Sequence, residues 1–172
     1  AFTSFSMYLI GQDSFKIVAW MMGYIGTSSW LRVGILTIPL IISVAYFYLK
    51  RYDLDLLLSG DEEAHSLGLD VGKLKRNILI ISSLIVGFSV AFTGMIGFVG
   101  LIAPHTIRLI TKSSSNVKLI PLATLGGGLF LLICDTIGRT ILSPVEIPIG
   151  IVTAFFGAPF FLYLAIKKGK GG

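Results

Sequence analysis

The stretch GFVGLIAPHTIRLI, residues 97–110, decides the fold, because it places a proline, a histidine and an arginine inside one of the most apolar parts of the chain. A membrane or a protein core normally excludes such residues. Glycine tolerates unusual backbone dihedrals, and proline suits the first turn of a new helix. We therefore expect one helix to end near Ile96, a bend at 97–102, and a short helix that starts at Pro104.

The composition indicates a membrane protein. The chain has 172 residues, of which 54% are hydrophobic and 13% are charged, whereas about a quarter of the residues in a soluble domain are charged. Several apolar runs are long enough to cross a hydrocarbon core of about 30 Å. The expected membrane helices are residues 31–50, 74–96, 103–112, 117–141 and 147–167.

The N-terminal residues 1–12 are apolar but too short to cross a bilayer alone, and they lack the basic region and cleavage pattern of a signal peptide. We expect them to be the end of a truncated helix; a genuine short N-terminal lead is the alternative. Residues 14–30 are expected to form an external connecting segment, because Trp20, Tyr24 and Trp30 are typical of an interfacial aromatic belt.

The basic residues predict the orientation. Most of the 14 lysines and arginines flank the loops 50–76 and 112–118 or lie at the C-terminus. Since positive residues favour the cytoplasm, these loops and the C-terminus are expected to be cytoplasmic, and the number of crossings then requires residues 103–112 to return inward. The net charge of +5 thus reflects topology. Nucleic-acid binding is not expected, because the basic residues form no surface stripe interleaved with aromatics.

The sequence shows little catalytic chemistry. The single cysteine, Cys134, lies in an apolar run, and the two histidines, His65 and His105, are far apart in the chain. It contains no G-x-S-x-G or H-E-x-x-H motif, and no span carries a pair of carboxylates. We expect neither an enzyme nor a bound cofactor or metal ion.

The stretch LDLLLSGDEEAHSLGLDVG, residues 54–72, is too polar to cross a membrane and too patterned for a simple linker. Gly60 breaks the chain, Asp61 suits the N-cap of a helix, and the acidic residues that follow suit its positive end. Gly68 suits the position that ends that helix. We expect a leucine-rich turn at 54–58 and then a helix of about two turns outside the bilayer.

Leucines in this stretch, Leu56, Leu57 and Leu67, must be buried against something if the segment lies outside the membrane. One alternative is an amphipathic segment that dips into the lipid interface, although its acidic start disfavours contact with an anionic inner leaflet. The other alternative, which we favour, is a docking surface for a cytoplasmic partner.

Charged residues also interrupt the stretch CDTIGRTILSPVEIPIG, residues 134–150. Asp135 and Arg139 are four residues apart, so they share one helix face and can form an intramembrane pair. Charges at such depth mark a pathway, a partner or a buried pair. Glu146 follows in a short loop. A structural ion pair and a docking role at the outer surface are the two alternatives.

The motifs WMMG, LSGDEEAHSLGL, GMIGFVGLIAPHTIRLI and DTIGRTILSPVEIPIGIVTAFFGAPFFLYL together resemble the FecCD family, in order and over residues 1–168. Members of this family are the membrane permease subunits of ABC importers for iron-siderophores, haem and cobalamin. The resemblance implies an all-α, multi-pass transmembrane helical bundle. It implies that the chain runs from the end of the fifth helix to the tenth helix of a ten-helix permease, with short cytoplasmic coupling helices in region 53–72.

The resemblance also implies alternating access driven by a separate ATPase subunit, so that this chain is not itself an enzyme. The implied partners are an ABC ATPase at the cytoplasmic face, an external substrate-binding protein, a second permease copy in a two-fold homodimer, and the lipid bilayer. The implied location is the cytoplasmic membrane of a prokaryote. An ATP-independent secondary transporter or channel is the alternative.

Three groups of residues take roles from the resemblance. The implied ATPase-coupling residues are Leu56, Leu57, Gly60, Asp61, Glu62, Ala64, Leu67 and Gly68. The implied docking residues for the binding protein are Arg139 and Glu146. The implied helix break near the central pathway comprises Gly97, Gly100, Pro104 and His105, and a purely structural His105 in a kinked helix is the alternative.

Overall fold

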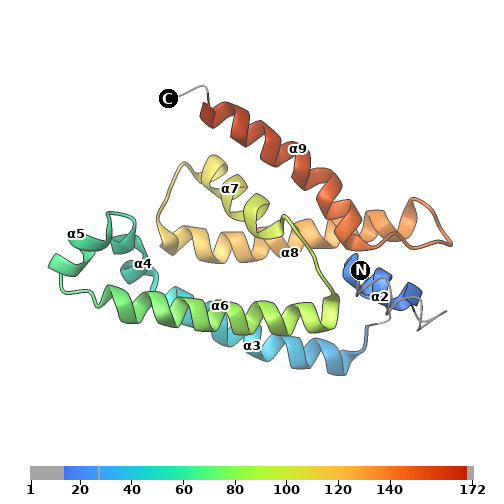
Figure 1. Ribbon diagram of the computed structural model, residues 1–172, viewed down its shortest axis with the longest axis horizontal. Coiled ribbons are helices and arrows are strands. Elements are labelled where there is room, and N and C mark those ends of the chain that lie inside the picture. The colour runs from blue at the N-terminus through green and yellow to red at the C-terminus, as the bar shows by residue number, and fades with distance from the viewer. Residues whose placement is uncertain (1–13, 27, 170–172) are drawn as a thin grey trace. The chain divides into compact units, whose positions relative to one another are not determined.

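A computed structural model describes residues 14–26 and 28–169, which form a series of helices (Figure 1). None of these described residues lies in a strand. Those helices that are long and apolar enough to cross a membrane are α3 (Trp30–Leu49), α6 (Val71–Thr93), α8 (Asn116–Thr140) and α9 (Ile149–Gly169). The shorter helices are α2 (Ser14–Met21), α4 (Arg51–Leu57), α5 (Asp61–Ser66) and α7 (Val99–Thr111).

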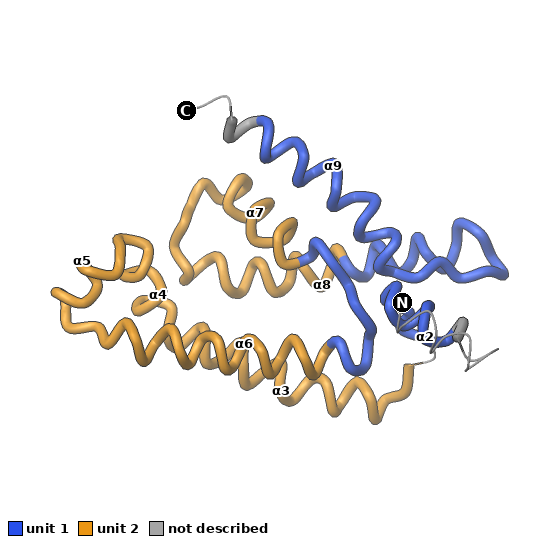
Figure 2. The backbone as a smooth tube through the Cα atoms, viewed as in Figure 1, with its two compact units in different colours: residues 1–27, 90–99, 131–172 blue, residues 28–89, 100–130 orange. Residues whose placement is uncertain are grey.

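The all-α, multi-pass membrane architecture predicted from the sequence is therefore confirmed. The helix end expected over residues 1–12 lies outside the described residues. The chain divides into two compact units (Figure 2). Unit 1 comprises residues 1–27, 90–99 and 131–172, and unit 2 comprises residues 28–89 and 100–130.

Large apolar side chains cover the surfaces of the spanning helices. Leu49 of α3 is 75% exposed, Leu125 of α8 is 72% exposed, and Phe155 of α9 is 74% exposed. In water, contiguous apolar surface of this kind marks an interaction site or an aggregation hazard. In a bilayer it faces a solvent that is as apolar as the side chains themselves, so this surface is what a membrane protein requires.

The first turns of α3 and α6 are capped by polar side chains. The Arg32 backbone N–H donates to Ser29 Oγ (3.3 Å) at the start of α3. At the start of α6, the Lys73 backbone N–H donates to Asp70 Oδ1 (2.9 Å). This cap explains why α6 starts at Val71, whereas the sequence pattern predicted a start at residue 74.

The helix break differs from the prediction. Helix α6 ends at Thr93 and α7 begins at Val99, with Pro104 inside it. The predicted helix start at Pro104 is therefore wrong, and the bend predicted at 97–102 lies earlier, at residues 94–98. The chain turns earlier because Gly94 (φ 72°) and Phe98 (φ 67°) take up left-handed backbone conformations. The Val99 N–H then donates to the Gly97 carbonyl (2.9 Å) as the next helix starts.

Backbones approach one another closely within unit 1. The Ile149 N–H donates to the Gly23 carbonyl (3.2 Å), and the Gly150 N–H donates to the Met22 carbonyl (3.1 Å), which ties the loop after α2 to the start of α9. A Cβ atom at Gly94 would overlap the Trp20 carbonyl oxygen. Glycine is thus required at position 94 by both its positive φ and the close backbone.

Candidate functional site

The polar region between α3 and α6 contains two short helices, α4 and α5, which we call the α4–α5 segment (residues 51–68). The leucine-rich stretch predicted as a turn is helical and forms most of α4. Gly60 (φ 118°) is the N-cap of α5, and Asp61 is its first helical residue, so the prediction of Asp61 as N-cap is wrong. Glycine takes that position because its backbone conformation there is outside the range of other residues.

Helix α5 ends where the sequence predicted. Gly68 has φ 87°, its N–H donates to the His65 carbonyl (2.9 Å), and the Leu69 N–H donates to the Ala64 carbonyl (3.1 Å). This is the Schellman arrangement, in which a left-handed glycine satisfies the last carbonyls of the helix. Ala64 is completely buried under it. The prediction that Gly68 terminates the helix is confirmed.

Exposure differs among the predicted coupling residues. Leu67 is 67% exposed, whereas Leu56 and Leu57 are only half-buried on α4. The first turn of α5, with Asp61 and Glu62, is exposed and acidic. The α4–α5 segment thus presents two exposed leucines, Leu58 (59%) and Leu67, together with a row of carboxylates.

Asp55 of α4 connects this segment to α8. Its Oδ1 accepts hydrogen bonds from the backbone N–H of Asn116 and from Asn116 Nδ2, both at 2.7 Å. Its Oδ2 accepts a hydrogen bond from Ser115 Oγ at 2.9 Å. Since Asn116 is the first residue of α8, Asp55 supplies an N-terminal cap to a membrane helix that lies far along the chain. Sequence reasoning missed this role, although the polar run at 113–116 before an apolar run is a typical helix start.

Three further contacts hold the segment to membrane helices. Lys75 of α6 forms an ion pair with Asp61 of α5, and both side chains are at least half exposed. Lys50, which follows α3, donates to Asp53 of α4 at 2.9 Å. This hydrogen bond raises the pKa of the Lys50 ammonium. Arg51 lies over the Tyr48 ring, 4.4 Å from its centroid. The α4–α5 segment is therefore attached to α3, α6 and α8.

A second cluster, which we call the Arg139 cluster, comprises Tyr24, Asp135, Arg139 and Glu146. Arg139 Nε donates to Asp135 Oδ2 at 2.8 Å, so the two residues expected to share a helix face form an ion pair. Arg139 Nη1 also lies 3.4 Å from Glu146 Oε1. All three charged side chains are 31–40% exposed.

The loop after α8 brings Glu146 to this cluster. The Ile147 N–H donates to the Gly138 carbonyl (2.9 Å), so the loop folds back on the end of α8. Tyr24 joins from the loop after α2, and its hydrogen bond to Glu146 raises the pKa of its phenol. Sequence reasoning predicted Tyr24 only as an interfacial aromatic.

The predicted helix-break residues do not form a cluster. Gly97 and Gly100 are exposed, and a Cβ atom at either would meet nothing within 4 Å. Pro104 and His105 are half-buried in α7. The residues that make the turn are Gly94 and Phe98 instead. Within residues 14–26 and 28–169, no three His, Cys, Asp or Glu side chains gather so that they could hold a metal ion.

Comparison with known proteins gives consistent matches. The FecCD transport family matches residues 1–167. The cobalamin import system permease protein BtuC of Halobacterium salinarum is 40% identical over 95% of this chain and 44% of its own length. The hemin transport system permease protein HmuU of Yersinia pestis is 38% identical over 87% of this chain and 44% of its own length.

A solved structure shares the fold. It is an inward-facing ABC transporter described as being of metal-chelate type, with 34% identity and a TM-score of 0.85. The match covers 95% of this chain and 53% of that chain. The present chain therefore spans about half the length of the proteins that it resembles.

Proposed function

The chain belongs to the FecCD transport family, and from this premise we propose that it is part of the membrane permease of an ABC importer. The proposed cargo is a metal chelate of the iron-siderophore, haem or cobalamin type. The proposed location is the cytoplasmic membrane of a prokaryote, with the C-terminus inside. Two permease copies, an ATPase subunit and an external binding protein would complete the importer.

The attachment of the α4–α5 segment to three membrane helices is the observation that carries this proposal. A surface that passes force from an ATPase to a permease must be exposed on one side and rigidly held on the other. Leu67 and the acidic first turn of α5 supply the exposed side. The contacts to α3, α6 and α8 supply the held side.

The contacts differ in strength, and the strongest one should transmit most of the movement of the α4–α5 segment to the membrane helices. The exposed pair between Asp61 and Lys75 contributes about 1 kcal/mol at most. Asp55 makes three hydrogen bonds as a charged acceptor in a part-buried position, and bonds of this type are individually stronger. The main route therefore runs from α4 through Asp55 to the start of α8.

Alternating access would then follow from a two-state movement of these helices. ATP binding in the separate ATPase subunit would move the α4–α5 segment, and α8 would follow through its cap. This is a coupling free energy between two sites, and it requires a rigid connection with two arrangements.

The Arg139 cluster is the proposed docking point for the external binding protein. A guanidinium carries five N–H donors, and Arg139 uses its Nε and Nη1 atoms for Asp135 and Glu146. Because the side chain is 40% exposed, its remaining N–H groups can donate hydrogen bonds to a carboxylate of a partner. The two acidic neighbours hold the guanidinium in place for that contact.

Co-purification tests the ATPase contact. The full-length permease is expressed with its ATPase and extracted in a mild detergent, as wild type and as Leu67→Asp. A matched control is Leu142→Asp, because Leu142 is also an exposed leucine (56%) in a short loop. We expect Leu67→Asp to release the ATPase and Leu142→Asp to retain it. If neither variant released the ATPase, the proposal that the α4–α5 segment contacts the ATPase would be contradicted.

A secondary transporter or channel is the competing function. It requires uptake that continues when ATP is depleted and when no ATPase subunit is present. Uptake that stops under both conditions supports the importer.

A further inference from the structure

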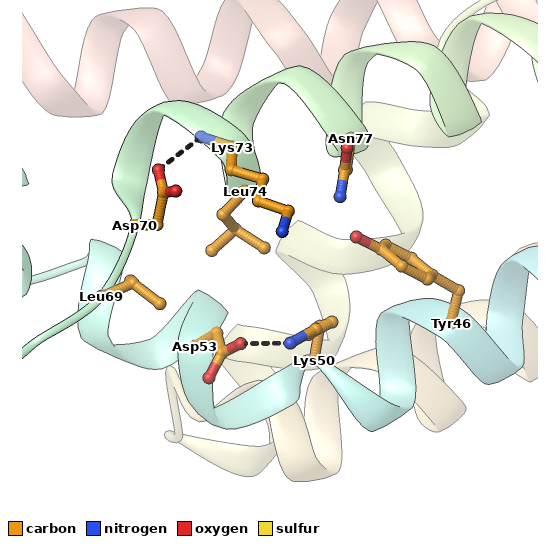
Figure 3. Close-up of a pocket in the computed structure, with 8 residues that line it drawn as sticks. All are labelled: Tyr46, Lys50, Asp53, Leu69, Asp70, Lys73, Leu74 and Asn77. Atoms are coloured by element: carbon orange, nitrogen blue, oxygen red, sulfur yellow. Dashed lines mark hydrogen bonds and ion pairs between the residues drawn. The ribbon is translucent and has the colours of Figure 1, made fainter.

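A cavity of about 270 Å³ lies between the end of α3, α4 and the start of α6 (Figure 3). The residues that line it are Tyr46, Lys50, Asp53, Leu69, Asp70, Lys73, Leu74 and Asn77. Lys50 directly follows α3, and Lys73 lies in the first turn of α6. Since both helices are membrane spans, the cavity lies at the level where a bilayer changes from acyl chains to headgroups.

Hydrogen-bond donors without partners converge on this cavity. The Tyr46 hydroxyl is buried and has no hydrogen-bond partner. Within the part of the chain that the structure describes, the Lys73 ammonium and the Asn77 amide also have no side-chain hydrogen bond or ion pair. Figure 3 shows these three groups directed toward one another. A buried hydroxyl without a partner is costly, so a ligand that accepts hydrogen bonds would satisfy it.

Each of the two carboxylates that line the cavity has one oxygen in a hydrogen bond to a nearby lysine. Asp53 accepts from Lys50 Nζ at 2.9 Å, and Asp70 accepts from the Lys73 backbone N–H at 2.9 Å. The Asp70 carboxylate also lies at the N-terminus of α6, where the helix dipole stabilises a negative charge. Among the described residues, the donors in the cavity that lack a partner are one ammonium and two neutral groups, namely the Lys73 ammonium, the Tyr46 hydroxyl and the Asn77 amide. They suit an anion with several oxygen atoms and one negative charge.

We propose that this cavity binds a phosphate ester, namely the phosphodiester of a membrane phospholipid. A phosphodiester carries one negative charge and presents several acceptor oxygens, which match the Lys73 ammonium, the Tyr46 hydroxyl and the Asn77 amide. Its acyl chains would lie along the exposed apolar surface of the spans, where Leu49 and Leu79 are 75% and 66% exposed. The bound phosphate would join the end of α3 to the start of α6.

Native mass spectrometry of the full-length permease tests this site. The delipidated protein is titrated with phosphatidylglycerol, as wild type and as Lys73→Gln and Tyr46→Phe variants. The matched control is Lys118→Gln, because Lys118 is an exposed lysine in the first turn of α8, as Lys73 is in α6, and it lies outside the cavity. Loss of a hydrogen bond to a charged group raises Kd about tenfold.

We expect Lys73→Gln to raise the Kd for phosphatidylglycerol about tenfold, Tyr46→Phe to raise it a few-fold, and Lys118→Gln to leave it unchanged. Equal Kd values for Lys73→Gln and Lys118→Gln would overturn the site. An unchanged Kd in Tyr46→Phe would also contradict it, because that variant removes only the buried hydroxyl and preserves the ring.

Soluble phosphate esters offer the same chemistry, so a second arm uses glycerol 1-phosphate without lipid. We expect no saturable binding that depends on Lys73 in this arm, because the acyl chains supply much of the affinity. If glycerol 1-phosphate bound as tightly as phosphatidylglycerol and Lys73→Gln abolished that binding, the claim that the ligand is a lipid would be overturned.

Discussion

Replacing Asp55 by alanine is the sharpest test of the connection between the α4–α5 segment and α8. The carboxylate accepts three hydrogen bonds, two from Asn116 and one from Ser115. Hydrogen bonds to a charged group are worth about 1.5–3 kcal/mol each when they are buried. Here the groups are part-buried, so in the variant water can form some of the hydrogen bonds that the Asp55 carboxylate made. The free energy that holds the Asn116 amide closed should therefore fall by about 2 kcal/mol, which also lies within the range for a lost N-cap.

A change of about 2 kcal/mol corresponds to a roughly 30-fold change in the local opening equilibrium. Hydrogen–deuterium exchange of the full-length permease measures it directly, in the peptide that covers residues 113–118. We expect the Asn116 amide to exchange roughly 30-fold faster in Asp55→Ala. Amides in the middle of α8 should not change, because their hydrogen bonds lie within the helix.

Asp53→Ala is the control for this experiment. Asp53 lies on the same short helix, but its carboxylate pairs with Lys50, whereas the hydrogen bonds to Asn116 and Ser115 are made by Asp55. Its removal should leave the exchange of the Asn116 amide as it is in the wild type. If Asp55→Ala and Asp53→Ala gave the same exchange rate at Asn116, the reasoning that places the α8 cap on α4 would be refuted.

Further predictions concern three other contacts. Gly94→Ala should lower the melting temperature of the full-length permease strongly, because its Cβ atom would overlap the Trp20 carbonyl and φ is positive, whereas Gly97→Ala, where a Cβ atom meets nothing, should have little effect. The Tyr24 phenol should titrate above its ordinary pKa of 10.0, and Glu146→Gln should lower that midpoint, as measured by ultraviolet absorbance after subtraction of the Tyr24→Phe spectrum. Since its folded pKa is raised, Tyr24 contributes stability below pH 10 that is lost as pH rises through the folded pKa. Asp61→Asn should change the thermal stability by less than about 1 kcal/mol, because its ion pair is exposed.

Local patterns in the sequence predict the parts of this fold that depend on neighbouring residues. The apolar run of α3, the glycine that ends α5 and the Asp135–Arg139 pair each depend on residues within one or two helical turns. Their physical causes, which are lipid burial, a left-handed cap and a shared helix face, are all visible in the sequence.

Contacts between distant segments could not be predicted in this way. The regular spacing of Gly94, Gly97 and Gly100 does not reveal which glycine has a positive φ. In the same turn Phe98 also has a positive φ, and its ring occupies the space that a Cβ atom at Gly157 would need. Tertiary packing therefore decides where α6 stops and α7 starts.

The α4–α5 segment and the Arg139 cluster also depend on contacts that the sequence alone does not predict. Asp55 meets Asn116 across 61 positions in the chain, and no local pattern pairs them. Arg139 was predicted to pair with Asp135, but its contact with Glu146 depends on how the loop after α8 folds back. The polar residues were visible in the sequence, whereas their partners required the structure.

The most direct test of the central proposal is the ratio of substrate imported to ATP hydrolysed in proteoliposomes. The reconstituted importer contains the full-length permease, its ATPase and its binding protein, and it is assayed with cobalamin, haem and a ferric siderophore. For the chelate that the wild type imports, we expect Asp55→Ala to retain the ATPase and to lower the transport ratio more than Asp53→Ala does, because the main route to α8 runs through Asp55. An unchanged ratio in Asp55→Ala, or uptake that persists without ATP, would contradict the account.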